Sequence, residues 1–541
     1  MKQIVFFFVV LLAASACMKG QKVDTIIYNG KIHTMDNGNK IVQAIAIRDG
    51  KIVEVGPDRQ IQNKYRADEF IDAKGKDIYP GLTDAHGHLM LLIQSRLGAD
   101  LTGSASMDEM LVRVEKFASK SAHKIVIGRG WDQSVWKEDF PDNSRLNALF
   151  PDRPVILFRI DAHAVLVNDA ALKLAGISSP EKVEGGEIVA KEGKCTGLLI
   201  DNAMEKILPF LPVYTDKEKT AVLQEIEQEL FQYGITSVHE AGITADELKY
   251  LQKVTSSGEI QFDIYAMLWP EKENIDFARK NGVYRKNNLT VRSFKVIGDG
   301  SLGSRGACLK QPYTDAPHTH GFLTATAARM KEIAEICQET GYQMNIHAIG
   351  DSTNKMVIDL LTEVNKVNQG HRWRIEHAQV LSSEDIQRLP ETGAFPSVQP
   401  LHAVSDYRWA VNRLGEERLK TAYAYRTILD KCGMIAIGTD FPVEHFDPFA
   451  TIHAAVERKD IHNMPAAGFQ KTEGLTLDEC LKGMTIWPAY ASFSEERTGS
   501  LEEGKEATFV IFETKVKSSA VFRENYSYMT FVKGKKVYSA E

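Results

Sequence analysis

Short apolar runs alternate with amphipathic helical patterns along most of the chain. Helical patterns such as residues 217–234 and 325–341 separate most of the runs, and Thr476 with Glu479 has the spacing of a capping box that starts a further helix. Eight strand-like runs lie at residues 77–86, 234–242, 262–268, 291–300, 342–351, 373–380, 393–400 and 434–442. Eight strands joined by helices predict an α/β fold, a (β/α)8 barrel of the TIM type.

The pattern changes toward both ends of the chain. Residues 23–78 contain short alternating strands with Asn-Gly and Asp-Gly turns between them, and residues 498–541 repeat this style. We expect these two segments to form one small composite β-sandwich domain, with residues 79–497 as the barrel. The interval from about residue 95 to 232 is too long for a single crossover, so we expect an insertion there.

The first 17 residues form a separate segment. Lys2 precedes an apolar run, and small residues lead to Cys17. The run is too short to span a bilayer, so it predicts an export signal. The small residues before Cys17 resemble the lipobox of bacterial lipoproteins, which implies lipidation of Cys17, attachment to a membrane by the lipid alone, and a place in the periplasm or cell envelope. A plain signal peptide cut nearby is the alternative.

Composition narrows the class of partner. The 541 residues carry 65 Lys and Arg against 72 Asp and Glu, a formal charge of −7, and there is no long basic run. This balance argues against a nucleic-acid partner. The five cysteines beyond Cys17 are scattered and have no C-x-x-C spacing, which argues against a disulfide framework or a thiolate metal site.

Polar residues end several of the predicted strands. His86 and His88 are two positions apart, so both can face the same side of a strand. Further polar residues at strand ends are Lys295, His347, His377 and Asp440. Each alone has a structural explanation, such as a hydrogen-bonded histidine or an aspartate that caps a turn. Together they lie at the carboxyl ends of the barrel strands, where catalytic residues of such barrels are found. Leaving these polar groups unpaired would cost about 1–3 kcal/mol each, so a metal ion is the predicted partner.

The sequence motifs around these residues resemble those of the amidohydrolase superfamily, in the branch called amidohydrolase family 3. This branch includes N-substituted formamide deformylase-like proteins. They are PGLTDAHGHL, GRGWDQSVW, DAHAVLVNDAAL, GITSVHEAG, KVIGDGSLGSRGA, HAIGD, IEHAQ, GTDFPVE and GSLEEGKEATFVIF. The likeness covers nearly everything after the signal.

The resemblance implies a set of metal ligands. His86, His88 and Asp440 would hold a first metal, His347 and His377 a second, and a carboxylated Lys295 would bridge the two. Nitrogen and oxygen donors fit one or two Zn²⁺ ions best and also admit Mn, Fe or Co. An uncarboxylated lysine beside a single zinc ion stays open.

The motifs shared with the family also suggest residues of a substrate pocket, which the insertion would cover. The candidates for substrate contact are Trp131, Asp132, His163, Asp299, Ser301, Arg305 and Gln399. For each, hydrogen bonding within a loop is an equal alternative. His239 ends the second strand, but the family pattern has no ligand there, so we expect it to support the ligands from behind.

These observations predict an exported metal-dependent hydrolase that cleaves a non-peptide, amide-type carbon–nitrogen bond in a small molecule. In the hypothesis, metal lowers the pKa of a bound water toward about 7, and Asp440 passes the water proton to the leaving nitrogen. One alternative keeps the metal and changes the bond to an ester, a carbamate or a cyclic amide. Another is a non-catalytic lipoprotein that binds metal or a small ligand. A homodimer is expected by analogy with relatives only.

Overall fold

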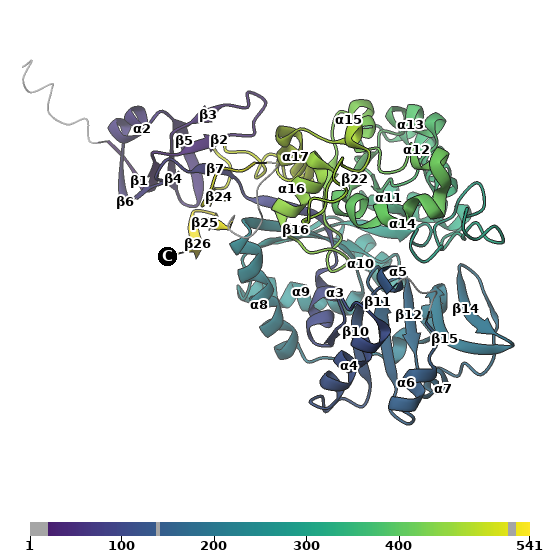
Figure 1. Ribbon diagram of the computed structural model, residues 1–541. Helices are drawn as coiled ribbons and strands as arrows, with labels where there is room; N and C mark the ends of the chain where they lie inside the picture. The colour runs from purple at the N-terminus through teal and green to yellow at the C-terminus, as the bar shows by residue number, and fades with distance from the viewer. Residues whose placement is uncertain (1–19, 137–140, 518–525, 541) are drawn as a thin grey trace, which may run out of the picture.

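The structure is a computed structural model, which describes residues 20–136, 141–517 and 526–540 (Figure 1). The predicted export signal at residues 1–17, with Cys17, lies outside the described residues. No helix in the described part of the chain is both long enough and apolar enough to cross a membrane.

Eight parallel strands form a nearly closed barrel, which confirms the predicted fold class. In spatial order they are β8 (Leu82–Gly87), β16 (Ile235–Ile243), β17 (Asp263–Leu268), β19 (Leu289–Ile297), β20 (Gln343–Ala348), β21 (Arg374–His377), β22 (Phe395–Val398) and β23 (Ala436–Ile437). A parallel bridge between Gly87 and Phe441 brings the two ends of the sheet together. This junction matters for function because it joins the first and last strands at their carboxyl ends.

Helices connect the strands and cover the barrel (Figure 1). The main ones are α3 (Leu89–Arg96), α8 (Asp216–Gln232), α9 (Ala245–Ser257), α10 (Lys272–Asn281), α11 (Ala327–Thr340), α12 (Asp351–Val367), α14 (Pro400–Leu419), α15 (Tyr425–Cys432), α16 (Pro448–Glu457), α17 (Leu477–Gly483) and α18 (Ile486–Ala491). Their apolar faces and the strands share one large buried cluster, which holds the barrel together. The capping box predicted at Thr476 and Glu479 is present at the start of α17.

The first predicted strand is divided in two. β7 (Asp77–Pro80) pairs with a C-terminal strand, and the barrel strand β8 begins only at Leu82. Gly81 lies between them, and a Cβ atom there would stand 2.1 Å from Thr236 Oγ1, so a side chain would prevent the close approach of β16.

Strands from both ends of the chain lie side by side (Figure 1). One sheet has the order β5 (Lys51–Gly56), β4 (Ala44–Arg48), β1 (Gln21–Tyr28) and β6 (Tyr65–Asp72). The other has the order β26 (Lys535–Ser539), β25 (Ser527–Val532), β24 (Phe509–Phe512), β7, β2 (Lys31–His33) and β3 (Ile41–Val42). Ile45, Ile78 and Phe509 belong to one buried cluster, so residues far apart in sequence share this core. His33 stacks on Tyr79 there, which is a structural contact.

The interval after α3 builds a separate seven-stranded sheet, here called the insertion (residues 99–211). Its order is β13 (Lys182–Val183), β14 (Gly186–Lys191), β15 (Lys194–Asp201), β12 (Ala164–Val167), β11 (Val155–Arg159), β10 (Val126–Trp131) and β9 (Ala99–Asp100). Two distinct apolar clusters include its residues, one with α4 (Met107–Ala118) and one with α7 (Asp169–Leu174) and η1 (Asn202–Lys206). The insertion therefore has its own core and can form a stable wall over the barrel.

Candidate metal centre

The junction of the first and last barrel strands brings three predicted ligands together. His88 Nε2 lies 3.0 Å from Asp440 Oδ1, and His86 Nε2 lies 3.4 Å from the same oxygen. Backbone hydrogen bonds fix the approach, since Asp440 N donates to His86 O and His88 N donates to Phe441 O, both at 2.7 Å. Gly87 is required between the histidines because a Cβ atom there would stand 2.1 Å from the Phe441 ring.

The other three predicted ligands lie beside this group. Lys295 Nζ is 3.0 Å from His86 Nε2, and the His377 ring centroid is 5.0 Å from that of His86 and 4.5 Å from that of His347. His377 and Asp440 have φ values of 71° and 63°, a left-handed conformation that costs free energy in non-glycine residues. The fold therefore holds these two side chains at the centre against a backbone preference.

Three buried imidazole nitrogens at the centre have no hydrogen-bond partner among the described residues: His347 Nε2, His377 Nδ1 and His402 Nε2. Leaving them so would cost about 1–3 kcal/mol each. The ligand atoms of His86, His88 and Asp440 lie within 4.8 Å of one another, as do those of His377, His402 and Asp440. Two groups of nitrogen and oxygen donors that share a carboxylate fit one or two divalent cations.

His402 was not among the residues predicted from sequence. It lies in the first turn of α14, its ring stacks with that of His377 at 5.9 Å, and its Nε2 is 3.7 Å from Asp440 Oδ2. The signal was available, because His402 is three residues beyond Gln399 and follows a predicted strand directly.

Glu376 was also missed, although it immediately precedes His377. His86 Nδ1 donates to Glu376 Oε2 at 2.6 Å, with both side chains fully buried. Burial alone would raise the pKa of Glu376, but His86 and then Arg374 hold it at about 2. An ionised acceptor on Nδ1 leaves the Nε2 lone pair of His86 free for a cation, as in carboxylate–histidine–metal arrangements.

The centre opens into a cavity of about 1020 Å³ between the barrel and the insertion. The insertion contributes the polar residues Arg129, Asp132, Arg159, Asp161, His163 and Asp201, and the barrel side adds Ser301, Gln379 and Asp406. Apolar lining comes from Met90, Leu91, Phe158, Leu208, Leu211, Trp269 and Trp409. Volume and mixed lining suit a small organic substrate.

Most charges on the insertion side of the cavity are paired with one another. Arg159 Nη2 contacts Asp132 Oδ1 at 2.8 Å, and the same guanidinium pairs with Asp161. His163 Nδ1 contacts Asp201 Oδ1 at 2.5 Å. Burial would lower the pKa of His163, but the Asp201 carboxylate raises it to about 9, so the ring carries a proton at neutral pH. The structure thus places the predicted residues Asp132 and His163 in the cavity wall.

Two predicted substrate residues have structural contacts instead. Trp131 is fully buried, does not line the cavity, and its Nε1 donates to Leu157 O at 2.7 Å within the core of the insertion. Gln399 precedes α14, and its side-chain amide donates to Ser397 O at 3.4 Å. In both residues the polar group donates a hydrogen bond to a backbone carbonyl. The sequence motif therefore indicated the region of the site but not which side chain in it faces the cavity.

Asp299, Arg305 and His239 also lie off the cavity. Asp299 accepts three backbone N–H groups of neighbouring loops, and its Oδ1 lies 3.6 Å from His347 Nε2, beyond hydrogen-bond distance. Arg305 Nη2 pairs with Asp315 at 3.2 Å. His239 Nδ1 accepts from the buried Arg374 at 3.0 Å.

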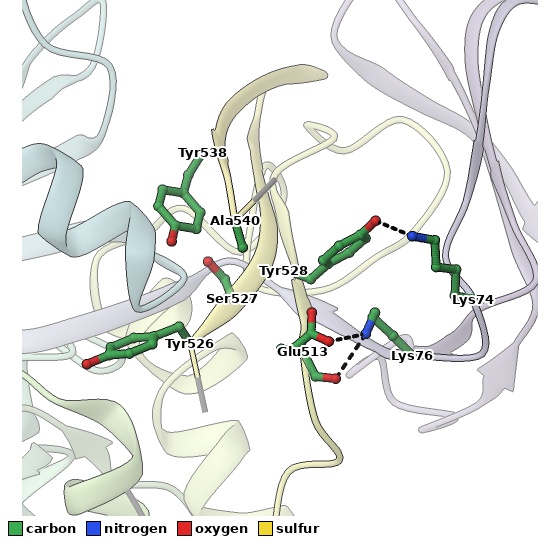
Figure 2. A pocket seen from close by; sticks show the side chains of 8 residues that line it. All are labelled: Lys74, Lys76, Glu513, Tyr526, Ser527, Tyr528, Tyr538 and Ala540. Carbon is green, nitrogen blue, oxygen red and sulfur yellow. Dashed lines mark hydrogen bonds and ion pairs between the residues drawn. The ribbon is translucent and has the colours of Figure 1, made fainter. Parts of the chain in front are cut away.

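A second, smaller cavity of about 460 Å³ lies between the chain ends (Figure 2). Its charged groups satisfy one another: Lys76 Nζ contacts Glu513 Oε1 at 2.7 Å, and Lys74 Nζ donates to Tyr528 Oη at 2.8 Å. None of the described residues that line it is a histidine. The barrel cavity, which contains the histidine nitrogens that are unpartnered within the described chain, is therefore the candidate functional site.

Comparisons with known proteins agree with this geometry. The profile of the amidohydrolase family, branch 3, matches residues 69–538. YtcJ of Bacillus subtilis (strain 168), named as an amidohydrolase, is 31% identical over 508 residues, 90% of this chain and 93% of that protein. The N-substituted formamide deformylase of Arthrobacter pascens is 26% identical over 518 residues, 91% of this chain and 94% of that protein.

A solved structure is similar over the same length. An uncharacterized metal-dependent hydrolase from Pyrococcus horikoshii superposes with a TM-score of 0.74 at 29% identity, over 91% of this chain and 97% of that one. The family profile spans most of the chain, and the barrel presents the donor set of a metal site at its carboxyl-terminal rim. This chain belongs to amidohydrolase family 3 and is a metal-dependent hydrolase.

Proposed function

We propose that this hydrolase cleaves a non-peptide, amide-type carbon–nitrogen bond in a small molecule. The observation that carries the proposal is the convergence of buried imidazoles and Asp440 at one point of the rim, facing a cavity of about 1020 Å³. The similarity to a protein named N-substituted formamide deformylase supports the amide class. Residues 1–17 support an accompanying proposal of export with a lipid on Cys17.

Two cation positions fit the donor set. His86, His88 and Asp440 would hold one. By the family pattern His347 and His377 would hold the other, where the structure also groups His402 and Asp440 with His377. Zn²⁺ is favoured, and Mn, Fe or Co are also compatible with these donors. A bound divalent cation supplies a Lewis acid for the carbonyl and lowers the pKa of a water to about 7.

Lys295 would connect the two positions as a carbamate. Burial lowers the pKa of the Lys295 ammonium, although the Glu376 and Asp440 carboxylates oppose that shift. A neutral amine can add to carbon dioxide with release of a proton, which gives an anionic oxygen ligand.

Asp440 would move the proton of the reaction. Burial would raise its pKa, but His86 and His88 hold the pKa well below the usual range, so the carboxylate is ionised at neutral pH. It also lines the cavity, where it can deliver that proton to the leaving nitrogen.

The alternatives keep the same residues. The site could act on an ester, a carbamate or a cyclic amide, since each presents a carbonyl to the same donors. A non-catalytic binder would use the same donors to hold metal without turnover, and a substrate panel separates it from an enzyme.

A substrate panel tests the proposal. The purified protein, loaded with Zn²⁺, Mn²⁺ or Co²⁺, is assayed against N-formyl amines, N-acetyl amines, cyclic amides, carbamates and esters, with and without a chelator. We expect amine release that the chelator abolishes and added metal restores. An inert panel with metal bound would support the binder, and activity confined to esters would replace the amide proposal.

A further inference from the structure

Arg129 is a buried arginine in the wall that the insertion gives to the cavity. Its side chain lines the cavity, and the residue is only 5% exposed. The guanidinium lies over the Phe158 ring at 4.2 Å from the centroid. Among the described residues no carboxylate pairs with it, and its Nη1 has no hydrogen-bond partner.

The other arginines that line the cavity are neutralised. Arg159, on the adjacent strand β11, pairs with Asp132 and Asp161. Arg329 pairs with Glu332 at 2.7 Å. Within the described part of the chain, Arg129 is thus the lining arginine that lacks a carboxylate.

The local backbone directs Arg129 away from the regular alternation of its strand. The pairing of β10 with β11 shifts between Arg129 and Trp131, and such a bulge re-aims a side chain. Gly130 within the bulge has φ = 106°, and a Cβ atom there would stand 2.4 Å from Thr102 Oγ1. Only glycine satisfies both conditions, so the bulge is built into the sequence.

A buried guanidinium without a counter-charge is costly, and proteins keep one where a ligand supplies the charge. Burial lowers the pKa of Arg129 to about 9, which still leaves the group protonated at neutral pH. Its planar fork of N–H donors matches the two oxygens of a carboxylate. Stacking on Phe158 fixes the plane of the fork before a ligand arrives.

We propose that Arg129 binds a carboxylate of the substrate at a distance from the scissile bond. The substrate class is then an amide that carries a carboxylate at the far end of an apolar carbon chain, since Leu208, Leu211 and Trp269 add apolar lining to the same cavity. This inference rests on the proposed function for the bond that is cleaved, whereas the anion site follows from the surroundings of Arg129.

Two assays on the metal-loaded full chain test the inference. The first compares kcat/KM for N-formyl ω-amino acids of increasing chain length with the matching N-formylalkylamines. The second measures binding of 6-aminohexanoate and hexylamine by calorimetry, which needs no turnover. Both use the wild type, Arg129→Met, Arg129→Lys and, as a matched control, Arg113→Met, because Arg113 lies in the insertion, pairs with Glu109 and does not line the cavity.

We expect the wild type to prefer the acids by about tenfold or more, with an optimum at one chain length. Arg129→Met should lose the preference, because its kcat/KM should fall at least about tenfold more for the acids than for the neutral amides. Arg129→Lys should recover part of the preference, and Arg113→Met should retain it.

Several results would overturn the inference. The first is that the wild type has the same kcat/KM and affinity for the acids as for their neutral partners. The second is that Arg129→Met keeps the preference for the acids, which would mean that the acid binds at the metals alone. The third is an equal loss of kcat/KM for both classes in Arg129→Met, which would make Arg129 structural. If no amide is cleaved, the calorimetry still decides, so failure of the proposed function is separable from failure of the anion site.

Discussion

On the barrel side of the cavity, three buried imidazoles keep a ring nitrogen without a hydrogen-bond partner among the described residues. On the insertion side, Arg159 contacts two carboxylates and His163 contacts Asp201. Both walls carry polar and charged groups and line the same cavity. Groups that pair with one another stabilise the wall itself, whereas buried groups without a partner are available to bind a ligand. Arg129 belongs to the insertion by sequence, but it resembles the barrel side because its Nη1 has no hydrogen-bond partner within the described part of the chain.

The largest expected effect is at the barrel side. Asp440→Asn should reduce kcat by about a thousandfold, because the amide oxygen can still face a cation but cannot take a proton. Assays of kcat with metal content measured on the same sample check this, and Asp447→Asn, which is off the cavity, is the control. A variant that holds its metal and keeps most of its activity would remove Asp440 from proton transfer.

The barrel could be predicted from sequence because each strand carries its own apolar run and each helix its own periodicity. The division at Gly81 could not, since residues 77–86 form one continuous run and only the distant Thr236 shows why the chain must turn there. The sheet of the insertion was equally hidden. Its strands are short, and their pairing depends on contacts between segments that no local pattern records.

The second prediction separates the two arginines of the insertion. Arg159→Met should lower the free energy of unfolding by about 2 kcal/mol, because it leaves the partly buried Asp132 and Asp161 without their cation. Arg129→Met should change it by less than about 1 kcal/mol or raise it, because it removes a buried charge that no described carboxylate balances. Urea unfolding of both variants checks this. Equal losses would show that Arg129 also holds the wall in place.

The third prediction concerns a carboxylate paired only with backbone. Asp447 caps α16, accepts from Phe449 N and Ala450 N, and burial raises its pKa to about 6. Between about pH 4 and 6 the unfolded chain ionises while the folded Asp447 stays protonated, so wild-type stability from this group falls as pH rises through that window.

Asp447→Asn keeps the cap and removes the titration. The variant should therefore gain about 2 kcal/mol relative to the wild type between pH 4 and 7, measured from urea midpoints across that range. Parallel stability curves for the two proteins would contradict this assignment.

The ligands at strand ends could be proposed from sequence because each strand delivers its last residues to the same rim. The residues that surround the ligands were harder to predict. A motif such as SVQPLH places two polar side chains near the rim, but the sequence does not show which of them faces the cavity. The backbone decides: Gln399 precedes α14, and His402 lies in its first turn. Glu376 was overlooked for a similar reason, because its partner His86 is 290 positions away.

The smallest expected effect tests whether the barrel side is arranged for a cation. Glu376→Gln keeps an oxygen that can accept from His86 Nδ1 but removes the charge, so metal affinity should fall by about tenfold while the fold persists. Competition with a chromogenic chelator measures the affinity. Glu227→Gln is the matched control, because Glu227 is also buried but accepts its hydrogen bonds from the backbone N–H groups of Gln261 and Phe262. If both variants bind metal as the wild type does, the His86–Glu376 contact is structural. If Glu376→Gln alone weakens binding, the charge behind the ring adjusts the donor that faces the cation.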